Sequence, residues 1–140
     1  MNTEAIKEYT QSIIFNQLFD DVLYIVESAT DYLENESLYD NALLDSKEQK
    51  NFGNQCLELT NRLSVISKAI LQYKALAKGE INSLQDIDLT PFEIKHNPNL
   101  SFKWNLLLTN SKHLHDRLQR IDNQFKTNKV SYFDNLNIKL

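Results

Sequence analysis

Between residues 52 and 77, apolar side chains recur at alternating spacings of four and three residues without interruption. The positions are Phe52, Cys56, Leu59, Leu63, Ile66, Ile70, Tyr73 and Ala77. This heptad pattern predicts an α-helix with all of these residues on one edge, where they can pack against other helices. Ser46 and Gln49 fit a capping box at its start, and Gly79 fits the first residue after its end. At about 1.5 Å per residue this helix is roughly 50 Å long, so we expect it to be the central element of the fold.

Two other segments show helical periodicity. In residues 11–36 the apolar residues form a wide stripe, typical of a helix that touches two neighbours, with Thr3 or Thr10 as its cap. Residues 101–126 have a narrower series, in which Ser111 is the one polar member. Its positions are Leu107, Ser111, Leu114, Leu118, Ile121 and Phe125. A serine there either bonds to the carbonyl four residues earlier or lets two helices approach closely.

The segments between these helices differ in character. Residues 36–45 form a short connector with room for one helical turn, so the first two helices should run antiparallel, with Asp31 and Glu34 near Lys47 and Lys50. We expect the apolar residues of this connector to close one end of the core; they are Leu38, Tyr39, Leu43 and Leu44. Residues 80–100 hold both prolines and form an irregular crossover. Its apolar residues, which we expect to pack on the bundle, are Leu84, Ile87, Leu89, Phe92 and Ile94.

The fold class that follows is all-α. The chain contains only two Gly and two Pro, which disfavours turn-rich β folds and favours long helices. We predict a three-helix bundle with long helices, an irregular crossover between the second and third, and a short C-terminal tail. Residues 1–126 form one helical-bundle domain in this prediction, and residues 127–140 form the tail.

The charge and cysteine content restrict the possible partners and compartment. The net charge is −4, and residues 1–45 carry ten acidic residues against one basic residue, so nucleic acid and anionic membrane are poor partners. The single cysteine excludes an intrachain disulfide. The first ten residues lack the apolar region of a signal peptide, and no apolar run has membrane-spanning length. These features predict a cytoplasmic protein.

Two of the three histidines occur as His113-Leu114-His115, which raises the question of a metal site. Residues two apart on a helix point about 200° apart, so His113 and His115 cannot hold one ion together. A site made by His96, His113 and Asp116 is conceivable, but the spacing favours histidines that flank the apolar series of a helix.

No other pattern indicates catalysis. Cys56 lies within an apolar series and has no histidine three or four residues later, which favours a buried structural thiol. Glu27, Asp31 and Glu34 share a helix face, but the Glu-x-x-His motifs of di-iron bundles do not occur. We therefore predict a non-enzymatic protein without a metal or cofactor.

Three segments resemble, in order and spacing, the alphaproteobacterial family of regulators of CtrA degradation. The first has the F-x-x-L-F opening and a later Tyr-Leu pair; the second has L-x-L-T-x-R-L and a Gly-Glu turn; the third has S-x-x-L-x-x-R-x-x-R-x-D. The matching positions are Phe15, Leu18, Phe19, Tyr32 and Leu33; Leu57, Leu59, Thr60, Arg62, Leu63, Gly79 and Glu80; and Ser111, Leu114, Arg117, Arg120 and Asp122. They cover the three predicted helices, about half of the chain.

The resemblance implies a dimeric, non-enzymatic adaptor. Members of this family help to bring the cell-cycle transcription factor CtrA and other cargo to the ClpXP protease. They act with a response-regulator-like adaptor and a cyclic-di-GMP-binding adaptor, and their flexible tail contacts partners. The tail positions that this implies for partner binding are Tyr132, Phe133, Leu136 and Ile138.

The residues themselves also favour self-association. Long helices leave more apolar surface than a three-helix core covers, and Tyr24, Leu71 and Leu76 lie beside the main apolar series, so we expect them at a homodimer face. A helical scaffold or structural interaction protein unrelated to proteolysis fits the heptad pattern equally well. A third helix that folds back on the other two would disfavour this alternative.

Overall fold

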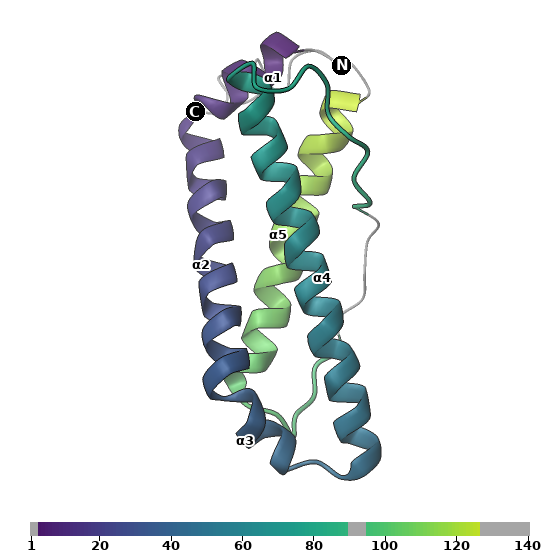
Figure 1. The fold of residues 1–140 in the computed structure, drawn as a ribbon. Helices are drawn as coiled ribbons and strands as arrows, with labels where there is room; N and C mark the ends of the chain where they lie inside the picture. The colour runs from purple at the N-terminus through teal and green to yellow at the C-terminus, as the bar shows by residue number, and fades with distance from the viewer. Residues whose placement is uncertain (1–2, 90–94, 127–140) are drawn as a thin grey trace.

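The computed structural model describes residues 3–89 and 95–126, and within them the regular elements are all helical. Figure 1 shows α1 (Thr3–Thr10), α2 (Ile13–Asn35), α3 (Ser37–Ala42), α4 (Ser46–Ala77) and α5 (Phe102–Lys126). The all-α prediction is confirmed, but these ranges contain five helices where the sequence predicted three. The two additional helices, α1 and α3, are short.

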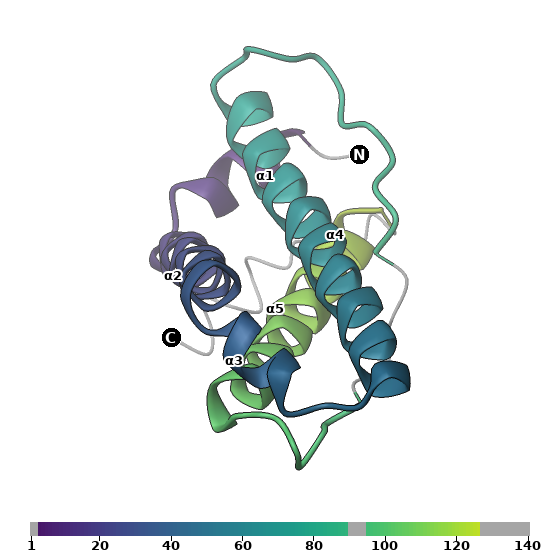
Figure 2. The same ribbon diagram turned by 60° about the horizontal axis from the view of Figure 1, so that its bottom comes forward.

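The three long helices α2, α4 and α5 lie side by side along most of the molecule and contact one another (Figures 1 and 2). As expected, α2 and α4 run antiparallel, whereas α5 runs in the same direction as α4. Two parallel neighbours need a connection that returns along the molecule, which explains the length of the crossover between Ala77 and Phe102. None of the helices in the described ranges is long and apolar enough to cross a bilayer.

A separate short helix, α1, precedes the predicted first helix, which begins at Ile13 after a break at Ser12. Ser12 Oγ accepts a hydrogen bond from the backbone N–H of Phe15 at 3.1 Å and donates one to the carbonyl of Tyr9 at 2.6 Å. Ser12 is therefore the N-cap of α2, and the predicted caps Thr3 and Thr10 are wrong. The break lets α1 turn onto α4, where Ile6 and Tyr9 become fully buried.

The long helix α4 is continuous from Ser46 to Ala77, as predicted. Its capping box, however, lies one residue earlier than expected. The Asp45 side chain accepts a hydrogen bond from the backbone N–H of Glu48 at 2.8 Å, and the Glu48 side chain accepts one from the backbone N–H of Asp45. At the other end, Gly79 has a φ of 75°. The amides of Gly79 and Glu80 donate to the carbonyls of Leu76 and Ala75, which completes the predicted glycine cap.

One hydrophobic core extends from α1 to the end of α5. Trp104 is fully buried at the α3 end, with its ring 5.3 Å from Tyr32 and 5.0 Å from Phe52. The crossover contributes Leu89, Leu84 and Ile87 to this core, as predicted; the other two predicted contacts, Phe92 and Ile94, lie outside the described residues.

Two other expectations concern pairing and α5. Lys103 of α5 pairs with Asp31 at 2.8 Å and Glu36 at 3.1 Å, whereas the sequence had placed Asp31 near α4 lysines. Ser111 is fully buried and donates to the carbonyl of Leu107 at 2.7 Å. This is one of the two structural roles predicted for it.

Candidate protein-binding groove

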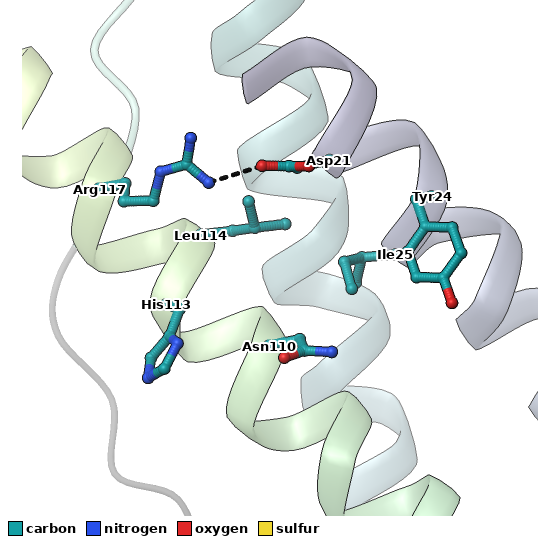
Figure 3. Close-up of a pocket in the computed structure, with 7 residues that line it drawn as sticks. All are labelled: Asp21, Tyr24, Ile25, Asn110, His113, Leu114 and Arg117. Atoms are coloured by element: carbon teal, nitrogen blue, oxygen red, sulfur yellow. Dashed lines mark hydrogen bonds and ion pairs between the residues drawn. The ribbon is translucent and has the colours of Figure 1, made fainter. Parts of the chain in front are cut away.

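A hollow of about 260 Å³ lies open to solvent between α2 and α5. We call this site the α2–α5 groove; its lining residues are Asp21, Tyr24, Ile25, Asn110, His113, Leu114 and Arg117 (Figure 3). On each helix these positions are three or four residues apart, so successive turns present them on one face. The groove is therefore formed by one face of α2 and the facing side of α5.

The floor of the groove is apolar and its walls are polar. Ile25 and Leu114 are buried between the helices, while Tyr24 leaves two thirds of its surface exposed. Arg117 Nη1 donates to Asp21 Oδ2 at 2.8 Å and joins the two walls (Figure 3). Because both side chains are partly exposed, this pair contributes only about 0–1 kcal/mol to stability.

The lining contains two residue types that are common in protein interfaces. Tyr and Arg are the side chains that most often dominate binding energy in protein interfaces, because each combines a large contact area with hydrogen-bonding groups. Tyr24 and Arg117 supply both types here, and Asn110 and His113 add polar groups between them. Two of the lining residues, Leu114 and Arg117, also belong to the third sequence segment described above.

The two adjacent histidines occupy different environments. His113 is exposed in the groove, but His115 is fully buried, which corrects the expectation that both flank the core. The reason is that α5 packs against both α2 and α4 and is buried over a wide arc. Burial lowers the pKa of His115, and the positive charge of Arg62 on α4 lowers it further.

The residues weighed as a metal site do not converge in the described part of the chain. His96 Nε2 bonds to Thr109 Oγ1 at 2.8 Å, and Asp116 pairs with Lys112 at 3.2 Å. Among residues 3–89 and 95–126, no three side chains of His, Cys, Asp or Glu are grouped as metal ligands. Cys56 packs against the core, and burial raises the pKa of its thiol to about 11, which keeps it protonated at neutral pH.

The predicted interface residues are not brought together. Tyr24 lines the α2–α5 groove, and Leu71 is 59% exposed on α4, outside the groove lining. Leu76 is only 5% exposed and belongs to the core, which contradicts the prediction that it lies at the dimer face. The α4 stripe turns Leu76 inward because α1 covers that end of the helix. Tyr132, Phe133, Leu136 and Ile138 lie outside the described residues.

Two buried polar contacts were not predicted. Asp40 is 6% exposed and accepts hydrogen bonds from the Tyr32 hydroxyl and, at 2.7 Å, from Ser101 Oγ. Burial, and then the Asp40 contact, raise the pKa of Tyr32 and keep its phenol a donor. Sequence spacing gives no signal for a contact between residues 61 positions apart.

The second contact joins α4 to α5. The Tyr73 hydroxyl donates to Asp122 Oδ1 at 2.7 Å, and burial followed by the Asp122 charge raises the pKa of Tyr73. Asp122 is the last position of the third matching segment, and Tyr73 belongs to the heptad series. Both residues were therefore identified in the sequence, but each was interpreted within its own helix, so the contact between them was not predicted.

Comparison with known proteins supports the resemblance inferred from the sequence at the level of fold. A comparison with curated proteins gives no match. The chain is similar in structure to the crystal structure of RcdA from Caulobacter crescentus CB15, with a TM-score of 0.67 and 22% sequence identity over 84% of this chain and 95% of that chain. A family model described as "Protein of unknown function (DUF1465)" matches residues 6–138. The chain therefore belongs to the DUF1465 family.

Proposed function

We propose that this protein is a non-enzymatic adaptor that acts by protein–protein binding. The observation that carries the proposal is the α2–α5 groove, whose Tyr, Arg and His side chains are displayed on an open helical surface instead of being enclosed around a reactive group. Such a surface suits the docking of a protein. The fold likeness to RcdA supports the more specific role inferred from the sequence, a regulator of ClpXP-mediated proteolysis of a CtrA-like cargo.

The alternative of a rod-like scaffold has less support. A scaffold built on the heptad series would extend its helices away from one another, but α5 packs against both α2 and α4. In our proposal the three long helices form the bundle of a domain spanning residues 1–126. Residues 127–140 then form the tail that contacts the protease or a response-regulator-like adaptor in the cytoplasm.

The proposed occupant of the α2–α5 groove is a second copy of the chain. The α2 wall carries Asp21, with Asp20 and Glu27 exposed nearby, and the α5 wall carries Arg117, with Arg120 exposed one turn later. A two-fold axis parallel to the groove places the acidic wall of one copy against the basic wall of the other. The groove is thus complementary to itself, with Tyr24 on its α2 wall. Leu71 is exposed on α4 outside the groove lining, so it remains a predicted dimer residue that this arrangement does not include.

Binding to purified partners tests the adaptor role. We expect the full-length chain to retain the ClpX-type ATPase or the response-regulator-like adaptor of the same cell, and a chain ending at residue 126 to lose this retention. Equal helix content in circular dichroism would show that the shortened chain is folded. If the full-length chain retains neither protein and does not alter the degradation of a CtrA-like substrate, the proteolytic role is wrong.

A further inference from the structure

Four bulky apolar side chains are exposed at the end of the molecule that contains α3. Leu38, Tyr39 and Leu43 are 76%, 77% and 74% exposed, and Phe102, the first residue of α5, is 79% exposed. This corrects the expectation that the connector residues close the core, since only Leu44 among them is buried. We call this group the α3-end patch. Aromatic residues offer about 150–250 Å² each, so Tyr39 and Phe102 alone present roughly 300 Å², an area at which apolar patches begin to indicate binding sites.

The patch is held together by a buried contact. Ser101 donates to Asp40 through both its hydroxyl, at 2.7 Å, and its backbone amide, at 3.4 Å. Asp40 points inward from α3, so Leu38 on the opposite face points outward. The contact fixes α3 beside the start of α5, as Figures 1 and 2 both show.

The surroundings of the patch are acidic. Residues 31–50 contain six acidic residues and two basic residues, the exposed Lys47 and Lys50. The nearby cation Lys103 is shared between Asp31 and Glu36, which leaves one negative charge in excess in that group. Glu34 and Asp45 are exposed and add to it. The charge therefore selects a basic occupant.

We propose that the α3-end patch binds a segment of another protein that combines bulky apolar side chains with Lys or Arg. A second copy of the chain is a poor occupant because two acidic ends would face each other, and an anionic membrane is repelled for the same reason. This inference goes beyond the proposed function, because the patch contains no residue of the α2–α5 groove. It gives an adaptor a docking surface separate from its dimer face.

A pair of model peptides tests the proposal on the full-length protein. The probes are a fluorescent amphipathic helix of Leu and Lys and a matched helix of Leu and Glu. We expect the Leu/Lys peptide to bind in fluorescence anisotropy and the Leu/Glu peptide not to bind. Leu38→Ser with Phe102→Ser should raise the Kd for the Leu/Lys peptide about tenfold or more, because these anchors supply the apolar contact.

Two further variants separate specific binding from general attraction to an acidic protein. Glu34→Lys should also raise the Kd while leaving the apolar anchors in place, and Ile13→Ser, at an equally exposed apolar site on α2, should not change it. The proposal is overturned if the Leu/Lys peptide does not bind, if Ile13→Ser weakens it as much as the patch variants do, or if the Leu/Glu peptide binds equally. It is also overturned if the patch variants abolish self-association in sedimentation, since the occupant would then be a second copy.

Discussion

At the scale of single residues, Asp40 shows how one buried carboxylate can join three helices. It lies on α3 and accepts hydrogen bonds from Tyr32 of α2 and from Ser101 at the start of α5. Hydrogen bonds to a charged group contribute about 1.5–3 kcal/mol each, more than bonds between neutral groups. The adjoining ring contact between Tyr32 and Trp104 depends on the same arrangement.

Replacing this carboxylate tests its contribution. Asp40→Asn keeps the shape but removes the charge, so we expect the free energy of unfolding to fall by about 1–3 kcal/mol. Urea denaturation followed by circular dichroism measures this change. Glu34→Gln, at an exposed site on α2, is the matched control and should leave the midpoint unchanged. A loss equal to that of the control would mean that Asp40 does not stabilise the fold.

His115 predicts a pH dependence of stability. Its pKa in the folded state is lowered by burial and by Arg62, with Asp116 opposing, whereas the pKa in the unfolded chain is about 6.5. Above pH 6.5 both states are neutral. Below it the unfolded chain binds a proton that the folded chain does not, so stability falls as pH decreases from about 6.5 toward the lowered folded pKa.

Urea midpoints at pH 7.5 and 5.5 measure this effect. The wild-type protein should be less stable at pH 5.5, and His115→Gln should reduce the difference between the two midpoints. His113→Gln, at the exposed neighbouring histidine, should keep the wild-type difference. The assignment to His115 is wrong if the two variants show the same dependence on pH.

At the scale of elements, the glycine within α4 and the glycine that follows its end act in opposite directions. Gly53 lies within the helix, and a Cβ built there meets nothing within 4 Å. Gly79 is equally uncrowded, but its φ of 75° is unfavourable for a residue with a side chain. The same substitution therefore separates helix propensity from backbone strain.

We expect Gly53→Ala to raise the free energy of unfolding by about 0.5–1 kcal/mol and Gly79→Ala to lower it by about 1–2 kcal/mol. Thermal melts monitored by circular dichroism give the sign of each change. Opposite signs support the assigned ends of α4. A loss of stability in both variants would mean that Gly53 is needed for a close approach that the described residues do not show.

The elements also show which features of a sequence are predictable. The long periodic series of apolar residues predicted α4 and most of α2 and α5, because tens of residues contribute to one periodic signal. A cap depends on one or two side chains, so the predicted cap, Ser46, was wrong by one residue. The break at Ser12 could not be predicted, because it depends on the burial of Ile6 and Tyr9 against a helix distant in sequence.

At the scale of the whole molecule, the direction of α5 determines the candidate site. Because α5 runs parallel to α4 and antiparallel to α2, Leu114 and Arg117 face the turns of α2 that carry Asp21 and Tyr24. The sequence marked Tyr24 as an exposed interface residue, and it also marked Leu114 and Arg117 by resemblance. It could not show that they share one groove, because that depends on how the helices pack and not on the spacing within each helix.

The proposed dimer predicts a charge-swap result. In this arrangement Asp21 of one copy faces Arg117 of the other. Asp21→Arg alone, or Arg117→Asp alone, places two like charges at this contact, so self-association should weaken about tenfold. The two substitutions together exchange the charges and restore an opposite pair at this contact, so association should recover. Sedimentation equilibrium measures each dissociation constant, and Ile13→Arg, exposed at the far end of α2, is the control. If the single variants associate as the wild type does, the groove is not the dimer face. If the double variant stays dissociated, the two walls do not face each other across a two-fold axis.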